Sequence, residues 1–297
     1  MIGFLNLNKS TGFTSHDCVA CVRRILHTKR VGHGGTLDPL ATGVLPIAIG
    51  SATRLLQFLP TPKIYRATVR LGVATNTDDL EGEVIQTCPG ASITREQIEE
   101  ALKAFQGQIQ QVPPMYSAIQ RNGKRLYELA RQGKVVEVEP RLVEIHSLKI
   151  LDWQGEGLDY PELTLQIDCG PGTYIRAIAR DLGAALQVGG TLAELIRTQS
   201  CGFDLDSSIS LSTLEAQAVS DEVSLTEPSV ALGHMSSVTL EEEEARRWCQ
   251  GQQIDLGAIP EAEWLRALGV DGSFLGVGQW HDERFVPKVV MNSCNTP

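Results

Sequence analysis

Residues 31–54 read VGHGGTLDPLATGVLPIAIGSATR, and this stretch organises the rest of the chain. Asp38 is the only acid in it, and Pro39 follows directly. A proline fixes its own backbone φ, removes a hydrogen-bond donor and keeps the preceding residue out of the α region. The apolar run from Val44 to Ile49 is typical of a buried strand. The sequence therefore predicts a lone carboxylate on a stiff loop that a core strand anchors.

Asp38 has two interpretations when only its residue type is considered. Aspartates in loops commonly form turns or cap the N-termini of helices. Loops on a rigid scaffold are also where proteins place nucleophiles and bases. The loop alone leaves both interpretations open.

The length and composition are those of a soluble globular protein of one large domain or two. The chain has 297 residues and a formal net charge of −10. It contains no apolar run of transmembrane length, and its N-terminus has no signal-peptide pattern. The seven cysteines are scattered, which is no disulfide framework and is typical of a reducing cytoplasm. We therefore expect a cytoplasmic protein that does not enter a membrane.

The charges are distributed unevenly along the chain. Residues 1–76 carry nine Lys and Arg against two acids, whereas residues 201–297 carry five against sixteen. Local patches, and not the net charge, attract a polyanion. The negative total therefore does not exclude a nucleic-acid partner, but it makes the C-terminal third the less suitable part for one.

The first helix is predicted by a capping box. Thr14 followed by Asp17 marks its start, and the pattern continues to about His27. Cys18 and Cys21 on this helix have the spacing of a metal or redox motif. No second cysteine pair or histidine pair accompanies them in the sequence, so we interpret them as small core residues.

Three strands and a second helix follow from local patterns. Residues 3–9 and 83–88 are short and partly apolar. Residues 63–71 alternate cleanly between apolar and polar side chains, which predicts the clearest strand of the chain. Tyr65 lies on its apolar face, where a core aromatic is the ordinary interpretation. A capping box and an apolar stripe predict a helix over residues 94–105.

Residues 111–134 combine five basic residues with two tyrosines and a single acid. Basic side chains interleaved with aromatics suit single-stranded or loop RNA, and Arg121 and Lys124 are the central cations. An amphipathic helix with a basic solvent face explains the same pattern. Both interpretations stay open.

Arg176 stands out in the second half of the chain. Residues 162–169 alternate as a strand, and a helix is predicted from about Thr173. Arg176 then falls in the first helical turn, where a cation opposes the helix dipole. A residue placed against its local preference is a candidate functional residue. The next stretch, residues 191–205, fits a strand or a short helix.

A small β-rich domain is predicted at the C-terminal end. Thr239 and Glu242 suggest a capping box for a helix, and residues 274–290 read as a β-hairpin. We place the domains at residues 1–234 and 235–297.

Several motifs together resemble the bacterial tRNA pseudouridine synthases that act on the T-loop uridine at tRNA position 55, the TruB family. Residues 32–46, GHGGTLDPLATGVLP, are similar to the catalytic loop of that family. Two positions depart from the family pattern: Ser10 stands where proline is usual, and Gln120 where lysine is common. The other similar segments are LNKSTGFTSHD, KIYRATVRLG, VPPMYSAIQRNGKRLYELARQG, GTYIR and, more loosely, GVGQWHDERFVPKVV.

The resemblance implies roles for individual residues. Asp38 would be the catalytic aspartate, and Tyr65 would stack on the target base and act in proton transfer. Arg176 would pair with Asp38 and also with Asp79. His33 would insert where the RNA loop is opened. With the basic cluster included, the predicted substrate-binding residues are His33, Asp79, Tyr174, Lys9, Arg121 and Lys124.

The resemblance also implies the architecture and the reaction. The expected fold is the α/β (α+β) pseudouridine synthase fold: a mixed, mainly antiparallel sheet with flanking helices, a central cleft and a PUA-like C-terminal domain. The expected partner is the T-loop and elbow of tRNA, and the expected state is a monomer. Isomerising uridine exchanges no electrons and imports no group, so we expect no cofactor and no metal.

Two other functions compete with this one. An RNA chaperone that refolds the tRNA elbow would use the same basic segments, but the set of Asp38, Tyr65 and Arg176 argues for catalysis. A metal-assisted hydrolase could use His33 and Asp38 as ligands, but the sequence offers no evident third ligand nearby.

Overall fold

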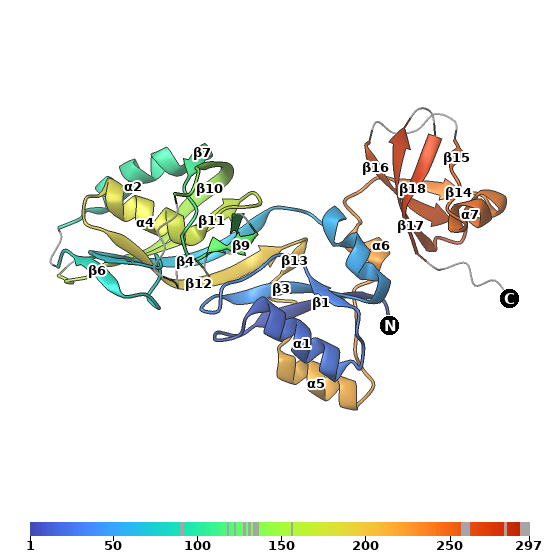
Figure 1. The fold of residues 1–297 in the computed structure, drawn as a ribbon, viewed down its shortest axis with the longest axis horizontal. Helices are drawn as coiled ribbons and strands as arrows, with labels where there is room; N and C mark the ends of the chain where they lie inside the picture. The colour runs from blue at the N-terminus through green and yellow to red at the C-terminus, as the bar shows by residue number, and fades with distance from the viewer. Residues whose placement is uncertain are drawn as a thin grey trace.

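The chain forms a long body with a small separate domain at one end (Figure 1). The computed structural model describes residues 1–291 except 90–91, 118, 122, 127–128, 130–131, 133–136, 156, 257–261 and 282–283. The side chains of residues 121, 124 and 125 are also outside this description. No helix within the described residues is long and apolar enough to cross a membrane.

A mixed sheet runs through the larger body. The described residues contribute nine strands: β1 (Gly3–Lys9), β2 (Val31–His33), β3 (Thr42–Ile49), β4 (Lys63–Leu71), β7 (Gly107–Gln111), β10 (Arg141–Gln154), β11 (Glu162–Cys169), β12 (Gly190–Ser200) and β13 (Phe203–Asp204). The main order is β1-β3-β12-β4-β11-β10-β7, with β2 beside β3 and β13 beside β12. β3 and β12 pair in parallel, and the other neighbours are antiparallel. This confirms the predicted mixed, mainly antiparallel sheet.

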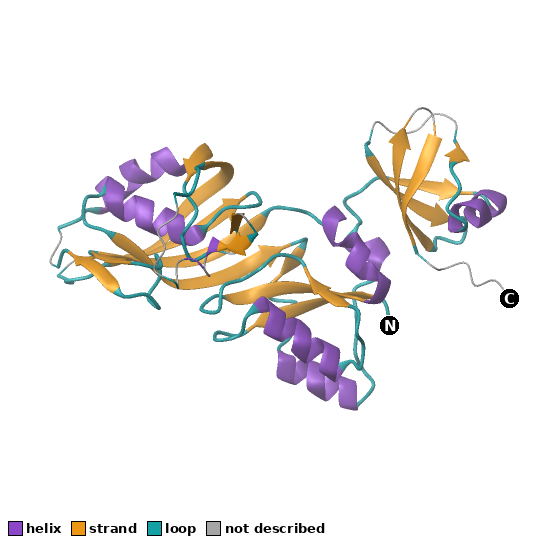
Figure 2. Ribbon diagram, viewed as in Figure 1, coloured by secondary structure: helices purple, strands orange, loops and turns teal. Residues whose placement is uncertain are grey.

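Two pairs of helices cover the two halves of this sheet (Figure 2). α1 (Ser15–Ile25) and α5 (Leu211–Val219) pack together beside β1 and β2. α4 (Ile175–Ala185) packs on β12 and β4, with α2 (Arg95–Leu102) next to it. Other short elements of this body include the 3-10 helices η1 (Gly50–Phe58) and η2 (Lys103–Phe105) and the strands β5 (Val73–Thr75) and β6 (Val84–Thr87).

Local patterns of the sequence set the helix starts and the strand faces. Both predicted capping boxes are present: Thr14 with Asp17 at α1, and Thr94 with Gln97 at α2. Along β4 the side chains alternate as predicted, and the face with Tyr65 is buried. That face packs into one core with the apolar side chains of β3, β11, α1 and α4.

Residues 191–205, which fitted a strand or a helix, are mostly the long strand β12 with the short β13. The basic segment begins as a hairpin, whereas Leu126 and Leu129, which the helix interpretation turned inward, are helical and Leu126 is buried. Residues 120–121 and 124–125 form a two-stranded hairpin, β8 (Gln120–Arg121) and β9 (Lys124–Arg125). Most of residues 127–136, where the rest of that helix was expected, lie outside the described residues.

The C-terminal domain is a five-stranded sheet with one helix, within the described residues. It follows the short α6 (Pro228–Ala231) and has the order β14-β16-β17-β18-β15. The predicted hairpin is confirmed as β17 and β18. The elements are β14 (Ser237–Leu240), α7 (Glu242–Cys249), β15 (Ile254–Asp255), β16 (Trp264–Gly269), β17 (Phe274–His281) and β18 (Arg284–Val290).

The predicted cap of α7 was wrong by two residues. Glu241 is the N-cap, and it forms its capping box with Glu244 instead of Thr239 with Glu242. The reason is that Thr239 belongs to β14 and pairs there with Leu268 of β16. The backbone of Thr239 is therefore committed to the sheet before the helix begins.

Most of the cysteines behave as predicted. Cys18, Cys21, Cys88, Cys169 and Cys201 are free thiols. Burial raises the pKa of Cys18 to about 11, so this thiol is neither a ready nucleophile nor a metal-binding thiolate. Cys249, in contrast, is disulfide-bonded, which the scattered spacing did not predict.

Candidate active site

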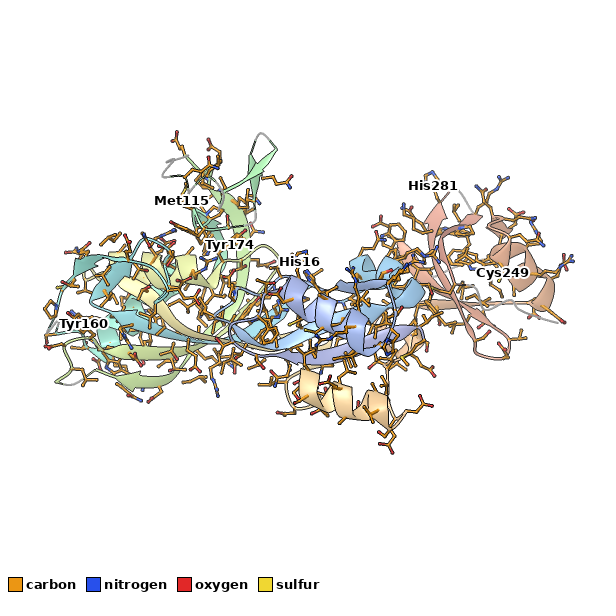
Figure 3. All side chains as sticks on the ribbon, turned by 60° about the horizontal axis from the view of Figure 1, so that its bottom comes forward. His16, Met115, Tyr160, Tyr174, Cys249 and His281 are labelled. Atoms are coloured by element: carbon orange, nitrogen blue, oxygen red, sulfur yellow. The ribbon has the colours of Figure 1, made fainter. Side chains whose placement is uncertain are left out.

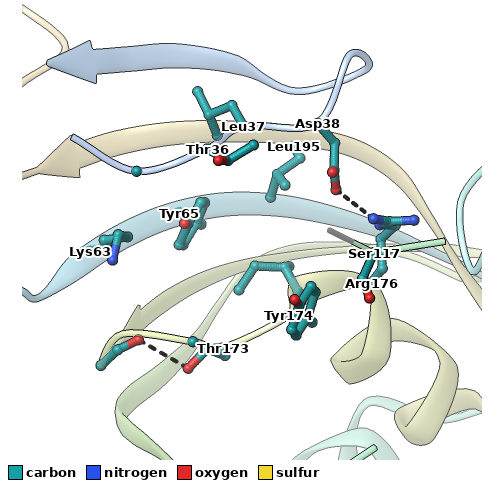
Figure 4. A pocket seen from close by; sticks show the side chains of 14 residues that line it. Thr36, Leu37, Asp38, Lys63, Tyr65, Ser117, Thr173, Tyr174, Arg176 and Leu195 are labelled. Atoms are coloured by element: carbon teal, nitrogen blue, oxygen red, sulfur yellow. Dashed lines mark hydrogen bonds and ion pairs between the residues drawn. The ribbon is translucent and has the colours of Figure 1, made fainter. Parts of the chain in front are cut away.

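A cavity of about 290 Å³ lies where the two halves of the sheet meet. The loop between β2 and β3 forms one wall, and β4 and β12 form the floor (Figure 4). The segment that leads into α4 forms the opposite wall. The side chains labelled around it are Thr36, Leu37, Asp38, Lys63, Tyr65, Ser117, Thr173, Tyr174, Arg176 and Leu195.

Asp38 and Arg176 form an ion pair at the edge of this cavity. Nη2 of Arg176 lies 2.9 Å from Oδ2 of Asp38 (Figure 4). The Asp38 side chain is 37% exposed, whereas that of Arg176 is only 5% exposed. A bound molecule can therefore reach the carboxylate, while the arginine orients it from below.

Arg176 is held by a second carboxylate and two carbonyls. Its Nη1 lies 3.4 Å from Oδ2 of Asp79, which is itself buried, and donates to the carbonyl of Thr77 at 3.1 Å. Its Nη2 donates to the carbonyl of Tyr116 at 2.9 Å. Two carboxylates compensate for a cation in the first turn of α4, where the helix dipole alone would disfavour it. The unusual placement of Arg176 is thus explained.

Buried donors fix the loop on both sides of Asp38. The Ser15 hydroxyl accepts from the amide of Leu37 at 2.8 Å and donates to its carbonyl at 3.2 Å. The carbonyl of Asp38 accepts from the amide of Ala41 at 3.1 Å, so Asp38 also forms a turn. The turn interpretation is therefore confirmed, and the turn presents the Asp38 side chain to the cavity.

Lys9 does not occupy the position predicted for a substrate-binding residue. Its side chain is fully buried, and Nζ donates to the carbonyls of Ser10, Phe13 and Pro39 at 3.0, 2.7 and 3.2 Å. Burial lowers the pKa of this ammonium. The side chain therefore holds the loop after Asp38, because the three carbonyls take up the ammonium donors that RNA would need.

Tyr65 faces the cavity from its floor and Tyr174 from the wall that leads into α4, as Figure 4 shows. Tyr65 is 7% exposed, and burial raises its pKa, so the phenol is neutral at pH 7. Tyr174 is the residue before α4, and its backbone forms two hydrogen bonds with the side chain of Gln111. Two aromatic rings thus border the space beside Asp38.

His33 lies at the end of β2, just before the loop, and does not line the cavity. Its ring meets that of His16 edge-on, with 5.4 Å between centroids. Burial, with His16 as a further cause, lowers the pKa of His33, so its ring is neutral at pH 7. Its insertion into the opened RNA loop, which the resemblance implies, stays a prediction.

The predicted RNA-binding residues Arg121 and Lys124 stand on β8 and β9. Their side chains lie outside the described part of the chain. Figure 3 shows the segment with Met115 and the following hairpin projecting from the sheet above Tyr174. Their backbone therefore lies in a hairpin that follows Ser117, which lines the cavity.

The cavity residues missed from the sequence include Lys63, Ser117 and Leu195, and Arg197 behind the wall was missed as well. Leu195 and Arg197 share the inward face of β12, since they pair with Ala67 and Tyr65 of β4. The alternation Leu195, Arg197 would have indicated both, had residues 191–205 been assigned to a strand. Burial, with Arg197 as a further cause, lowers the pKa of Lys63.

No group of three or more His, Cys, Asp or Glu within the described residues could hold a metal ion. The pair of His33 and Asp38 therefore gains no third ligand from that part of the chain. A hydrolase that needs three protein ligands finds no support there.

Comparison with known proteins assigns the chain to a family. The family model "TruB family pseudouridylate synthase (N terminal domain)" matches residues 23–175, and "Pseudouridine synthase II TruB, C-terminal" matches residues 236–291. The tRNA pseudouridine synthase B of Gloeothece citriformis is 53% identical over 98% of both chains. That of Microcystis aeruginosa is 52% identical over 98% of this chain and 99% of the relative.

Solved structures share the fold at lower sequence identity. A chain from a Cbf5-Nop10-Gar1 complex has a TM-score of 0.72 and 23% identity, covering 97% of this chain and 84% of its own. A chain from an H/ACA RNP bound to a substrate RNA containing 2'-deoxyuridine has a TM-score of 0.69 and 24% identity, covering 93% and 77%.

The sheet, the cavity at its centre and these matches define a pseudouridine synthase, an isomerase that acts on uridine in RNA. The two matched regions are residues 23–175 of the larger body and residues 236–291 at the C-terminal end. The chain belongs to the TruB family of pseudouridylate synthases, and the resemblance first seen in its motifs is confirmed.

Proposed function

We propose that the protein converts the uridine at position 55 in the T-loop of tRNA to pseudouridine, with Asp38 acting at the ribose of the flipped nucleotide. The observation that carries this proposal is the Asp38 carboxylate, oriented by Arg176 at 2.9 Å and open to a cavity of about 290 Å³. The names of the relatives, tRNA pseudouridine synthase B, support tRNA as the substrate.

The reaction is balanced within the nucleotide. The bond from N1 of uracil to C1′ breaks, the base turns, and a bond from C5 to C1′ forms. C5 then loses its proton and N1 gains one, so no electrons and no group enter from outside. The enzyme must supply a carboxylate at the sugar, a surface for the base and a proton acceptor.

Asp38 can serve the sugar in two ways. Its carboxylate can attack C1′ and form a covalent intermediate, or it can remove the proton from C2′ so that a glycal forms. A substrate with deuterium at C2′ of the target uridine separates these routes. A slower single turnover supports proton removal, and an unchanged rate supports attack at C1′.

The other residues take roles that fit their places. Tyr65 stacks on the flipped base, and its hydroxyl takes part in the late proton transfer at C5. Asp79 acts through Arg176, and Tyr174 borders the opposite wall of the site. His33, as a neutral ring, fills the space that the base leaves. Arg121 and Lys124 contact phosphates of the T-arm.

The proposal includes the state of the protein. It acts as a monomer in the cytoplasm, with residues 1–234 as the catalytic domain and residues 235–297 as a PUA-like domain. Gel filtration with light scattering tests the monomer, since a dimer would double the mass at micromolar concentration.

The decisive experiment is tritium release from a tRNA transcript labelled at C5 of its uridines. Wild type and Asp38→Asn are compared, each with and without EDTA. We expect release by wild type alone, unchanged by EDTA, and a tRNA affinity of the variant within about threefold of wild type, because the carboxylate acts in chemistry and not in docking. Release by Asp38→Asn would remove Asp38 from the mechanism. Tight binding without release by wild type would favour an RNA chaperone, and release that EDTA stops would favour a metal enzyme.

A further inference from the structure

Arg197 lies behind the wall of the cavity and has no role in the function described so far. It stands on β12 and is fully buried. A buried cation is costly for a fold unless its donors are satisfied. The acceptors of its guanidinium donors therefore indicate which part of the structure the buried charge stabilises.

All three nitrogens of its guanidinium donate to backbone carbonyls. Nη2 donates to Gly35 at 3.1 Å, and Nη1 to Thr36 at 3.4 Å. Nε donates to Val44 of β3 at 2.8 Å. Gly35 and Thr36 are the residues that lead to Asp38, so one side chain ties the start of this loop to the strand that follows it.

The conformation of Gly35 fits this contact. Its φ is +103°, which residues with a side chain rarely adopt. A Cβ there would lie 3.6 Å from Nη1 of Arg197 and 3.5 Å from Cε of Lys63. The backbone thus runs close over the guanidinium in a shape that glycine permits.

Arg197 also faces Tyr65. The two residues are paired in the antiparallel β12–β4 ladder, so their side chains project to the same side. The guanidinium is close enough to favour the ionised phenol, against the effect of burial, which dominates and raises the Tyr65 pKa. The same cation therefore contacts the loop of Asp38 and lies beside the second group of the site.

We propose that Arg197 is a positioning residue that holds the Asp38 loop and the Tyr65 hydroxyl in one geometry, so that both act on the same nucleotide. The inference rests on the proposed function, because it assigns Arg197 a part in that reaction. Lys9 and Ser15 hold the loop at Pro39 and Leu37, and Arg197 holds it at Gly35 from the position on β12 that pairs with Tyr65 of β4.

The test compares Arg197→Lys with Arg70→Lys as the matched control. Arg70 is also on this sheet, but it pairs with Glu162 on a half-exposed face. A lysine at 197 keeps the charge and loses the forked geometry that reaches three carbonyls. We expect its single-turnover rate of tritium release to fall by about 100-fold, with affinity for a T-arm stem-loop within about threefold. We expect Arg70→Lys to keep the single-turnover rate and the affinity of wild type.

A double-mutant cycle with Tyr65→Phe tests the link to the hydroxyl. If Arg197 acts partly through that group, Arg197→Lys lowers the rate less in the Tyr65→Phe background than in wild type. Equal losses in the two backgrounds would overturn the link. A wild-type rate in Arg197→Lys, or equal losses of rate and affinity, would overturn the positioning role, as would an unfolded Arg197→Lys protein.

These outcomes are separate from the failure of the proposed function. Wild type that releases no tritium from the tRNA would remove the function and the inference with it. Active wild type beside an unaffected Arg197→Lys variant would remove the inference alone.

Discussion

Asp79 is buried and forms an ion pair with Arg176, which in turn orients Asp38. Asp79 therefore supports the site without contacting the substrate. Asp79→Asn leaves a buried guanidinium with one carboxylate in place of two, so we expect the free energy of unfolding to fall by about 3 kcal/mol. Urea unfolding measures this. Glu162→Gln removes a similar pair with Arg70 on a half-exposed face and is expected to cost below about 1 kcal/mol. Equal losses of unfolding free energy in the two variants would show that the buried Asp79–Arg176 pair contributes no more than a half-exposed ion pair.

His33 predicts a pH dependence of stability. Its pKa in the folded protein is lowered from 6.5 by burial, so the unfolded chain binds the proton more readily. The stabilisation is present above pH 6.5 and is lost as the pH falls from there towards the folded pKa. We expect wild type to lose more stability than His33→Gln between about pH 7.5 and pH 5.5, by urea unfolding. His234→Gln, at an exposed histidine, serves as control and should follow wild type.

At the scale of elements, the junction of β3 and β12 depends on Gly43. Its φ is +98°, and a Cβ would lie 2.3 Å from the carbonyl oxygen of Arg197. Gly43→Ala is therefore expected to lower the free energy of unfolding by about 3 kcal/mol, since it combines backbone strain with a clash against backbone. Gly12→Ala has a similar φ of +82° but open space, and should cost about 1 kcal/mol. If calorimetry gives the two variants equal losses of unfolding free energy, the close approach of β3 and β12 at Gly43 adds nothing to the cost of the substitution.

The elements also show what the sequence can predict. Alternation in β4 and the boxes at Thr14 and Thr94 are local signals, and all three were correct. Lys9 was assigned to the wrong role and Arg197 was missed, because part of the partners of Lys9 and all those of Arg197 lie in the distant loop of Asp38 and in β3. A strand assignment for residues 191–205 would have placed Arg197 on the inward face, but the sequence does not show which carbonyls it meets. For the same reason the pair of Asp38 with Arg176 needed a family resemblance before the fold brought the two together.

At the scale of the whole molecule, the uneven charge distribution indicates which domain is expected to bind RNA. Residues 201–297 carry sixteen acids against five basic residues, so they are expected to add little to RNA binding. The hairpin with Arg121 and Lys124 projects from the sheet near Tyr174, which lines the cavity. A cation that neutralises a phosphate releases counterions, and this is measured as the slope of log Kd against log salt.

We therefore expect the double variant Arg121→Ala and Lys124→Ala to bind a T-arm stem-loop more weakly and to reduce that slope by about 0.7 for each phosphate that is no longer neutralised. The matched control is Arg284→Ala with Lys288→Ala, which removes two charges from β18 in the acidic domain. Its slope should equal that of wild type, because those cations face no phosphate. A slope that falls in the control and stays constant in the hairpin variant would place the RNA on the C-terminal domain and reverse the assignment.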